Sequence, residues 1–476
     1  MPATLYLTPS IAAARVHLAN EVAALQRRDR FTPVHILLPT AEATRQVRRS
    51  LGDVVAIRLL RFPGLCQALL DQAAAAGLGD TPRLASNAEA RRVLRLVLDE
   101  MHQSGELSSF APVRDKPGMV RVLLDWLAEV QSQAIAQERL EEQARRSQSE
   151  RDRQLGGVYR RYTTSLEARG CADQAGLPLA TARMVNALPD FRGPCQRLFV
   201  LGFDQFSPAR LALLAALAKR LEELAVYLLW DEPRERDDLA LSRLRSTRES
   251  LRAAISPREI QLTDGEAPPS GLAELKHALF QLDPAVQTAT ADGSIHLVAA
   301  PSREAEVRWV MRHVKRLLLE GRAQHDDILV AAPRPATYRH LVRAVAEEYG
   351  VQVHMRQPLL GNPAVAALFA LLELAPDFPR RAVLDALRCP YTRGWLDEEQ
   401  IGLLDRLTRE RPVLSGKEQW LDALQPVPAT LDHEDEDRQA PLLAGSFTAD
   451  ELAAIRDGLE RFFSAVTPPA GEHDHG

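Results

Sequence analysis

The amino-terminal part of the chain alternates short apolar runs with longer segments of helical periodicity. Residues 5–7 and 34–39 are apolar runs bounded by turn formers, a pattern typical of strands that are buried on both faces. Thr40 is placed to cap the helix that follows the second run, and Gly52 is placed to end it. A third β-type run lies at residues 54–57. Strands that alternate with helices predict a parallel sheet with right-handed crossovers.

Helical patterns alone fill the segment from about residue 62 to residue 187. Ser86 and Glu89 have the spacing of a capping box at the start of one of these helices. Strand-type runs then return at residues 197–203 and 225–230, with a weaker one at 259–262. A helical block therefore interrupts an α/β sheet, as an insertion would.

A second α/β pattern begins after residues 264–293, which are rich in turn formers and read as a linker with one short helix. Its apolar runs at residues 295–298, 328–331 and 351–353 predict three strands. Beyond Pro376 only helical patterns remain until the polar tail. Because three strands make a small sheet, we expect one of its apolar edges or faces to be uncovered.

Composition places the chain among ordinary globular proteins. A length of 476 residues exceeds a single core, so we expect two to four domains, and 46% hydrophobic and 26% charged residues are typical values. No window approaches the ~18 consecutive apolar residues of a membrane span. The first residues show no secretory signal. We therefore expect a cytoplasmic protein without membrane contact. No two of the four cysteines are close enough for a metal knuckle.

Basic residues gather in several places although the net charge is only -5. Most of them alternate with apolar residues at helical spacing, so we interpret them as solvated helix faces. Contact with nucleic-acid phosphates would require several of them on one surface. The clusters are Arg45/Arg48/Arg49, Arg91/Arg92/Arg95, Arg160/Arg161 and Arg308/Arg312/Lys315/Arg316.

The first strand and helix form the frame in which a P-loop would lie, with backbone N–H groups and the helix N-terminus around a phosphate. The intervening Thr8-Pro9-Ser10, however, contains neither glycine nor lysine. Glycines let the backbone approach phosphate, and lysine meets its charge. The frame is present and the phosphate-binding residues are absent.

Four segments in this order resemble those of superfamily-one helicases of the UvrD type. LYLTPSIAAARV is similar to the strand and Walker A segment, LLPTAEATRQVRRSL to the next strand and a helix with a DNA-contact motif, and LFVLGFDQFSP to the Walker B strand. PSREAEVRWVMRHVKRLLLEG, followed by DDILVAAPRPATYRHLV, resembles the start of the second RecA-like domain. The chain most closely resembles the N-terminal half of the AddB (RexB) subunit of bacterial helicase–nucleases, and more distantly RecC.

The resemblance implies a degenerate nucleotide site. The family's Gly-x-Gly-Lys-Thr ending aligns on residues 11–15, and its two Walker B carboxylates align on Leu201 and Gly202. Arg334 lies near the place of a nucleotide-contacting arginine of the second domain. Since these replacements supply neither phosphate contacts nor a Mg²⁺ ligand, we expect no ATP hydrolysis and no cofactor in this chain. The positions of the expected site are Ile11, Ala13, Ala14, Arg15, Leu201, Gly202 and Arg334.

The expected fold is α/β, with two RecA-like parallel-sheet domains, the first interrupted by an all-helical insertion and the second leading into helices. The expected segments are 1–62 with 196–263 (first RecA-like domain), 63–195 (insertion), 264–293 (linker), 294–376 (second RecA-like domain, incomplete), 377–465 (helical) and 466–476 (polar tail).

The resemblance further implies a non-catalytic subunit that binds DNA, expected to be single-stranded, beside an AddA-like partner in double-strand-break repair. Phosphate and stacking contacts do not depend on the P-loop. Thr40, Arg45, Phe62 and Gln205 lie at places that correspond to helicase DNA motifs. Thr40 is equally well explained as a helix cap, and Phe62 as a core residue.

The family also carries a PD-(D/E)xK nuclease with a 4Fe-4S cluster near its far C-terminus. Pro189-Asp190 and Glu274-Leu275-Lys276 match the two halves of that motif only superficially, because the second lies in a predicted helix, where positions i and i+2 face apart. We therefore expect the chain to end before such a domain. Two alternatives remain: the N-terminal part of an active helicase–nuclease subunit, and an assembly protein without DNA contact.

Overall fold

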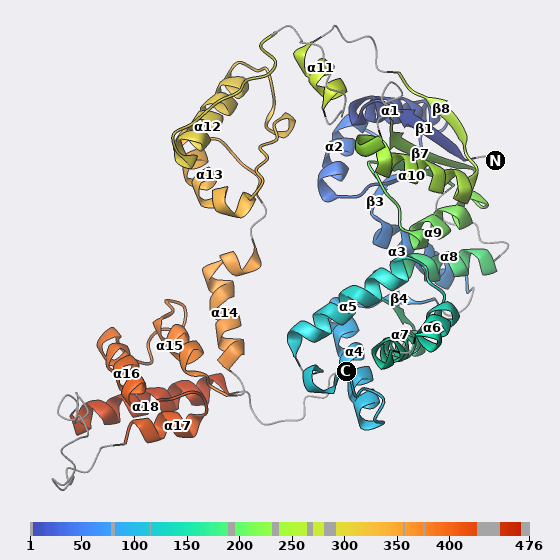
Figure 1. The fold of residues 1–476 in the computed structure, drawn as a ribbon. Helices are drawn as coiled ribbons and strands as arrows, with labels where there is room; N and C mark the ends of the chain where they lie inside the picture. Colours follow the sequence, from blue (N-terminus) through green and yellow to red (C-terminus); the bar gives the residue numbers. More distant parts are fainter. Residues whose placement is uncertain are drawn as a thin grey trace. The chain divides into compact units, whose positions relative to one another are not determined.

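The structure, a computed structural model, forms two compact units, residues 1–297 and 298–476 (Figure 1). The residues that it describes are 3–77, 81–114, 116–147, 149–188, 196–230, 238–263, 270–279, 292–355, 358–374, 377–425 and 448–467.

The first unit is built on a six-stranded sheet in which all neighbouring strands pair in parallel. The strands are β1 (Thr4–Thr8), β2 (Val34–Leu37), β3 (Ile57–Leu60), β6 (Arg197–Leu201), β7 (Glu223–Leu229) and β8 (Arg258–Gln261), in the spatial order β3-β2-β6-β7-β1-β8. The sequence-based prediction that the runs near residues 5, 34, 197 and 226 share one parallel sheet is confirmed.

The third strand lies three residues later than predicted. Val54 is in a turn, in which its N–H donates to the carbonyl of Gly52, and Ala56 has a positive φ of 56°. The ladder with β2 starts only at Ile57, opposite Val34. The apolar run at 54–57 therefore mostly forms the approach to the strand, because strand register is set by the neighbouring strand.

Helices cover both faces of the sheet (Figure 1). One face packs against α1 (Ile11–Arg28) and α2 (Ala41–Leu51). The other packs against α3 (Phe62–Ala75), α8 (Leu177–Ala187), α9 (Pro208–Ala218) and α10 (Asp238–Ile255). The first and last helices of the predicted insertion, α3 and α8, therefore belong to the layer on the sheet, because their apolar stripes are buried against it.

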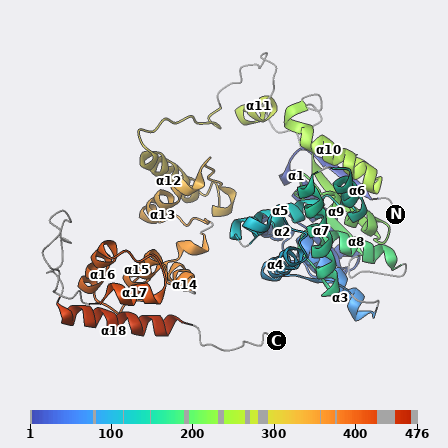
Figure 2. The same ribbon diagram turned by 60° about the horizontal axis from the view of Figure 1, so that its bottom comes forward.

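A helical body lies between α3 and α8 in the sequence and has a core of its own. It contains α4 (Asn87–Gln103), η1 (Ala111–Val113), α5 (Pro117–Ser132), α6 (Gln137–Arg146) and α7 (Glu150–Ala168), which lie together in both ribbon views (Figures 1 and 2). The predicted capping box of Ser86 and Glu89 is confirmed. The prediction of helices alone is wrong in one detail, since β4 (Arg83–Leu84) and β5 (Cys171–Ala172) pair in parallel. Two-residue strands give no periodicity that a sequence could reveal.

Asp173 ties this body to the helix layer of the sheet. Its carboxylate accepts hydrogen bonds from Gln131 Nε2 on α5 (2.8 Å), from the Tyr162 hydroxyl on α7 (2.9 Å) and from the Gly176 amide before α8 (2.8 Å). Burial, and then the Asp173 charge, raise the pKa of Tyr162, so this phenol stays protonated and donates. A Cβ atom at Gly176 would collide with the Gln131 side chain.

The second unit contains α12 (Arg303–Leu319), η3 (His325–Asp327) and α13 (Pro335–Tyr349), which pack around Met311 and Val345. The three strands predicted at 295–298, 328–331 and 351–353 are wrong, because none of these segments joins a strand ladder among the described residues. An apolar run becomes a strand only where a neighbour supplies hydrogen bonds, and Leu329 is instead 89% exposed.

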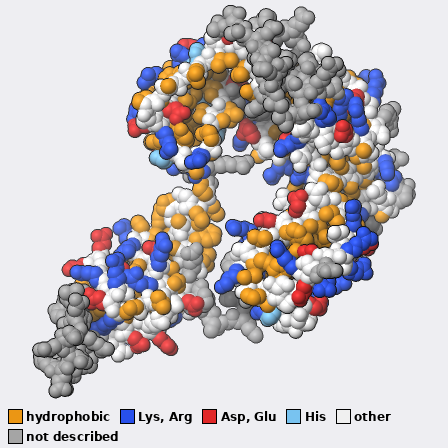
Figure 3. Space-filling model, in the orientation of Figure 1, with side chains coloured by type: hydrophobic (Ala, Val, Ile, Leu, Met, Phe, Trp, Pro, Cys, Tyr) orange, Lys and Arg blue, Asp and Glu red, His pale blue; other side chains and the backbone are white. Residues whose placement is uncertain are grey.

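The rest of the second unit is helical in its described parts, and beyond residue 376 this was predicted. It comprises η4 (Leu359–Gly361), α14 (Pro363–Leu374), α15 (Arg380–Arg388), α16 (Glu398–Glu410), α17 (Lys417–Ala423) and α18 (Ala449–Val466). α15 to α18 enclose a core around Trp420 and Phe462. Leu368 and Leu372 on α14 are exposed, and hydrophobic side chains line this helix in Figure 3. Apolar surface is thus uncovered in this unit, although on a helix and not on a sheet.

Two further features complete the described chain. The predicted linker contains α11 (Gly271–Ala278), and most of its remaining residues lie outside the described ranges. Among the described helices, none combines the length and the apolar character that crossing a bilayer requires.

Gly458 on α18 provides a test of packing in the C-terminal helices. A Cβ at this position would lie 2.7 Å from the Trp395 carbonyl oxygen and would also collide with the Leu396 side chain. We expect Gly458→Ala to lower the stability of this body by about 1–3 kcal/mol. Gly402→Ala on α16, where a Cβ would meet nothing within 4 Å, should instead raise it by up to about 1 kcal/mol. Hydrogen exchange of α16 and α18 measures both; equal effects of the two variants would contradict this packing.

His35 on β2 predicts an acid-sensitive sheet. Its side chain is 2% exposed, and neither ring nitrogen has a hydrogen-bond partner among the described residues. Burial, and then the Arg58 charge on β3, lower the pKa of His35 to about 4. The unfolded chain takes up this proton near pH 6.5, so stability is lost as the pH falls from there towards 4. By about pH 5 the loss is roughly 2 kcal/mol.

We expect His35→Leu to remove most of this dependence while preserving the apolar packing. The measurement is the thermal midpoint of the first unit at about pH 7.5 and about pH 5 in both proteins. A midpoint that falls by the same amount in the variant would show that other groups cause the acid sensitivity.

Candidate functional site

The carboxyl edge of the sheet is where ligands bind in open parallel sheets. The first connection on this edge is short, since β1 ends at Thr8 and α1 begins at Ile11. Ser10 caps α1: its Oγ accepts a hydrogen bond from the Ala13 amide (3.0 Å), and its carbonyl accepts one from Thr8 Oγ1 (2.8 Å). A phosphate loop instead needs several residues that direct backbone N–H groups at the anion. This turn uses one of those amides for its own cap.

The residues on which the resemblance aligns the Walker A ending pack or cap the helix. Ala14, the expected lysine position, is fully buried against the sheet. Arg15 has a buried Nε atom for which no described group accepts a hydrogen bond. Ile11 is 40% exposed and stands at the mouth of a cavity, and Ala13 donates to the cap. The helix start therefore offers apolar packing and no phosphate contact.

The Walker B positions are equally changed. Leu201 is 2% exposed in the same core as Ala14. Gly202 has a φ of 86°, which favours glycine, and its Cα faces the ring of Pro39. Neither residue supplies a carboxylate for Mg²⁺. Arg334 is exposed directly before α13 of the second unit.

Ile11 and Gly202 nevertheless line one cavity, of about 440 Å³, together with Tyr227, Asp204 and Arg243. Asp204 pairs with Arg243 at 3.3 Å, with both side chains about two-thirds exposed. A single exposed carboxylate that is already paired is a poor Mg²⁺ ligand. Among the described residues no group of three His, Cys, Asp or Glu side chains is arranged to hold a metal ion. Two of the residues at the expected nucleotide site thus line one cavity, and the described residues around it offer no Mg²⁺ site.

Tyr227 lies between this cavity and the core on the α1 face of the sheet. Its ring stacks on Tyr6 with centroids 4.9 Å apart, and its hydroxyl lies 3.0 Å from Nδ1 of His17. Burial raises the pKa of Tyr227, and the nearby Tyr6 and acidic side chains add to this effect. The phenol therefore stays protonated and shares a hydrogen bond with the histidine, so we assign it a structural role.

A second cavity, of about 770 Å³, separates the helical body from the segment that follows β6. Gln205, one of the predicted DNA contacts, is exposed and lines it. Its basic lining residues are Arg91 on α4, Arg121 on α5 and Arg210 on α9. Its acidic lining residues are Asp125, Glu129, Asp173 and Asp204. Such a mixed lining suits a ligand that carries both anionic groups and hydrogen-bond donors, as a nucleotide does.

The segment 202–210 borders both cavities, since Asp204 lines each of them. Aromatic packing holds this segment in place. The ring centroids of Phe203 and Phe206 lie 5.4 and 6.3 Å from that of Phe62. The guanidinium carbon of Arg210 lies 4.9 Å from the same centroid. Burial lowers the pKa of Arg210. Phe62 is 4% exposed, so its ring is not available for stacking on a base in this structure, and the core interpretation describes its place.

The two remaining predicted DNA contacts lie on α2. Thr40 caps this helix by accepting a hydrogen bond from the Ala43 amide (3.1 Å). Arg45 is exposed and forms an ion pair with Glu42 on the same helix. Among the basic clusters, several arginines are already engaged with acidic side chains. Arg161 and Arg308, for example, are paired with Glu106 and Glu348.

Sequence reasoning did not select several residues that shape these cavities. Asp204 could have been noticed, because it places a carboxylate three positions after Leu201 within the Walker B-like segment. Arg91 was included in a basic cluster but not placed at a site. Arg121 and Arg243 carry no local signal, because only the packing of distant helices brings them to the cavities. Pro189-Asp190 lies outside the described residues, and Glu274–Lys276 lies in α11, as predicted.

A family model described as "ADDB, N-terminal" matches residues 47–282. This span covers the helical body and the sheet strands from β3 to β8, including the segment between the two cavities.

Several similar curated proteins are each named as the B subunit of an ATP-dependent helicase/deoxyribonuclease. The protein of Bacillus subtilis is 22% identical over 347 residues, covering 68% of this chain and 29% of that protein. That of Desulforudis audaxviator is 28% identical over 294 residues, covering 57% and 25%. That of Moorella thermoacetica is 25% identical over 487 residues, covering 94% and 40%. The chain thus spans well under half the length of these relatives.

The nucleotide cavity leads to a direct prediction. Because the resemblance aligns Ala14 and Leu201 with the lysine and carboxylate positions, and both are buried apolar residues, we expect no Mg²⁺-dependent ATP hydrolysis above background. We also expect no rise in the thermal midpoint with ATP, whereas a ligand at a hundred times its Kd would stabilise the fold by about 2.7 kcal/mol. Turnover that disappears when residues 10–15 are substituted would overturn this interpretation.

Proposed function

The chain is an AddB-like protein, and from this premise we propose that it serves as a DNA-binding, helicase-fold subunit that does not itself hydrolyse ATP. The observation that carries the proposal is the two-residue turn between β1 and α1. In this turn the Ser10 hydroxyl already accepts the hydrogen bond of an amide at the helix start. A turn of this kind keeps the sheet and helix in place and does not direct several backbone amides at a phosphate.

The biological setting that we propose is an AddAB-type helicase–nuclease in double-strand-break repair. The names of the relatives describe the B subunit of an ATP-dependent helicase/deoxyribonuclease. By analogy, a partner subunit resembling AddA would hydrolyse ATP, and this chain would hold the DNA. We further propose that the six-stranded sheet corresponds to the first RecA-like domain, and that α12 and α13 correspond to the start of a second.

Single-stranded DNA is the ligand that the larger cavity supports best. Arg91 and Arg121 can contact phosphates, and Gln205 with Asp125 can hydrogen-bond to base edges. The cavity lies between the helical body and the carboxyl edge of the sheet, next to the segment that borders the former nucleotide site. None of these contacts requires ATP turnover by this chain.

The test is fluorescence anisotropy with a labelled oligothymidylate over a range of salt concentrations. We expect affinity to fall with salt, and the double variant Arg91→Gln/Arg121→Gln to reduce the slope of log K against log salt by about 1.4, or about 0.7 per phosphate. The matched control is Arg92→Gln/Arg95→Gln, which removes the same charge from exposed positions of α4 that do not line the cavity.

Two results would contradict the proposal in different ways. Absence of salt-dependent DNA binding by the wild-type chain would favour an assembly protein without DNA contact. Binding that weakens equally in both double variants would show a diffuse electrostatic effect and would remove the cavity from the DNA path.

A further inference from the structure

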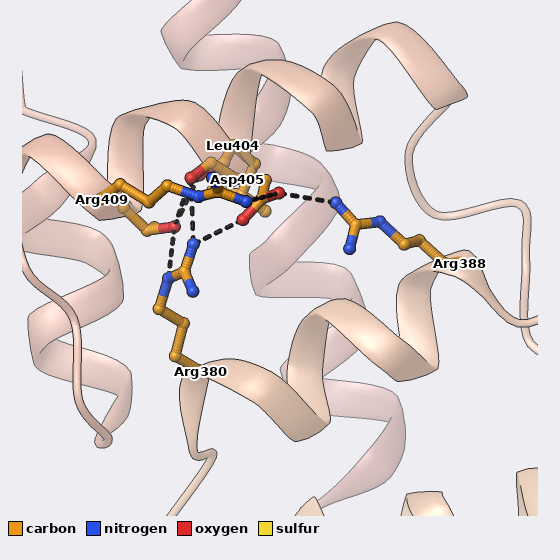
Figure 4. A network of polar contacts seen from close by, with 6 residues as sticks. Arg380, Arg388, Leu404, Asp405 and Arg409 are labelled. Atoms are coloured by element: carbon orange, nitrogen blue, oxygen red, sulfur yellow. Dashed lines mark hydrogen bonds and ion pairs between the residues drawn. The ribbon is translucent and has the colours of Figure 1, made fainter.

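A cluster of charged side chains joins α15 and α16 in the second unit (Figure 4). Asp405 on α16 faces three arginines, and its side chain is only 14% exposed. Arg380 and Arg388 reach it from the two ends of α15, and Arg409 reaches it from the next turn of α16. The described contacts thus bring three guanidinium groups to one carboxylate.

The three arginines have different roles. Arg380 donates from Nε to Thr408 Oγ1 (2.9 Å), and from Nη2 to the Asp405 carbonyl (3.0 Å) and carboxylate (2.5 Å). Its side chain is 27% exposed, so it acts as a link between the two helices. Arg388 and Arg409 each donate one N–H to Asp405 Oδ2, both at 2.9 Å. Their side chains are 50% and 69% exposed.

The charge of this cluster is not balanced. One carboxylate faces three guanidinium groups. Hydrogen bonding from Arg388, and then the contacts with Arg409, hold the pKa of Asp405 below its ordinary value. The nearby Asp385 pairs with Arg381 at 3.7 Å and does not neutralise the excess. Lys and Arg side chains gather over this part of the unit in Figure 3. The surface thus carries a local excess of positive charge in a chain whose net charge is -5.

Geometry makes the exposed pair suitable for an anion. The two donating nitrogens bind the same oxygen, so they are no farther apart than twice the hydrogen-bond length. A guanidinium has five N–H groups in a rigid fork, and the described contacts of Arg388 and Arg409 use one each. Asp405 therefore holds two forks close together with further donors on the solvent side. Arrangements of this kind favour phosphate, which accepts bidentate hydrogen bonds.

We propose that Arg388 and Arg409, oriented by Asp405, form a binding site for phosphate groups of a nucleic-acid backbone. This assignment rests on the proposed DNA-binding function and adds a contact on the second unit to it. The site contacts the backbone only, so it gives affinity and registration without sequence preference.

The experiment compares the full chain with Arg388→Gln/Arg409→Gln in oligothymidylate binding. Asp405 keeps its bonds to Arg380 in the variant, so the helix pair should stay folded. Loss of two phosphate contacts lowers the slope of log K against log salt by about 1.4. The ratio of wild-type to variant affinity should therefore become about sevenfold smaller when the salt concentration rises from about 50 to about 200 mM. The control is Arg456→Gln/Arg461→Gln on α18, which removes the same charge from exposed positions of the same body.

The outcomes separate this inference from the proposed function. If the wild-type chain binds DNA and the two double variants change the affinity equally, the phosphate site is overturned and the proposed DNA binding stands. If the wild-type chain binds no DNA, both proposals are overturned. Tight binding of inorganic pyrophosphate that needs both arginines, with DNA affinity unchanged, would assign the site to a free phosphate compound and reject the nucleic-acid assignment.

A second variant covers a loss of folding. If the glutamine pair lowers the thermal midpoint, Arg388→Lys/Arg409→Lys keeps both charges but removes the forks. Weaker DNA affinity with an unchanged salt slope would support the site, and affinity equal to that of the wild type would overturn it.

Discussion

The position of the first strand is the constraint on which the first unit depends. β1 lies between β7 and β8, so its backbone bonds are completed by strands more than 210 residues further along the chain. The sheet can therefore close only after the chain has passed through the helical body and returned. Long-range parallel pairing carries a large loop-closure entropy, and here it also fixes the ends of β1 and β6 at one edge. The two cavities exist because of this closure.

The carboxyl edge of the sheet is occupied by packing and capping contacts. At the start of α1, Ser10 satisfies the Ala13 amide, and Ala14 and Leu201 belong to one core. The polar groups near the edge serve other contacts. Asp204 pairs with Arg243, and the Tyr227 phenol, whose pKa is raised by burial, shares a hydrogen bond with His17.

Polar contacts of high connectivity also hold the helical parts together. Asp173 joins α5, α7 and the start of α8. Glu259 on β8 accepts hydrogen bonds from Arg252 and Arg248 on α10, which connect the strand to the helix. These bonds lower the pKa of Glu259 to about 2. In the second unit Asp405 has the corresponding place between α15 and α16. Partly buried carboxylates with several donors contribute more than isolated surface pairs, and the Asp405 cluster differs from the others because three guanidinium groups face its carboxylate.

The sequence by itself determined the elements whose signals are local. Periodicity located β1, β2, β6 and β7, and capping residues such as Ser86 and Thr40 marked helix starts, because these patterns depend on neighbours a few positions away. The absence of phosphate and metal ligands at residues 11–15 and 201–202 could likewise be read directly from residue types. Tertiary structure decided the rest. It shifted β3 to Ile57, where β2 offers a partner, and it left the apolar runs of the second unit outside any described ladder. It also brought Arg121, Arg243 and the three arginines around Asp405 to their places, because contacts between distant helices leave no period and no spacing in the chain.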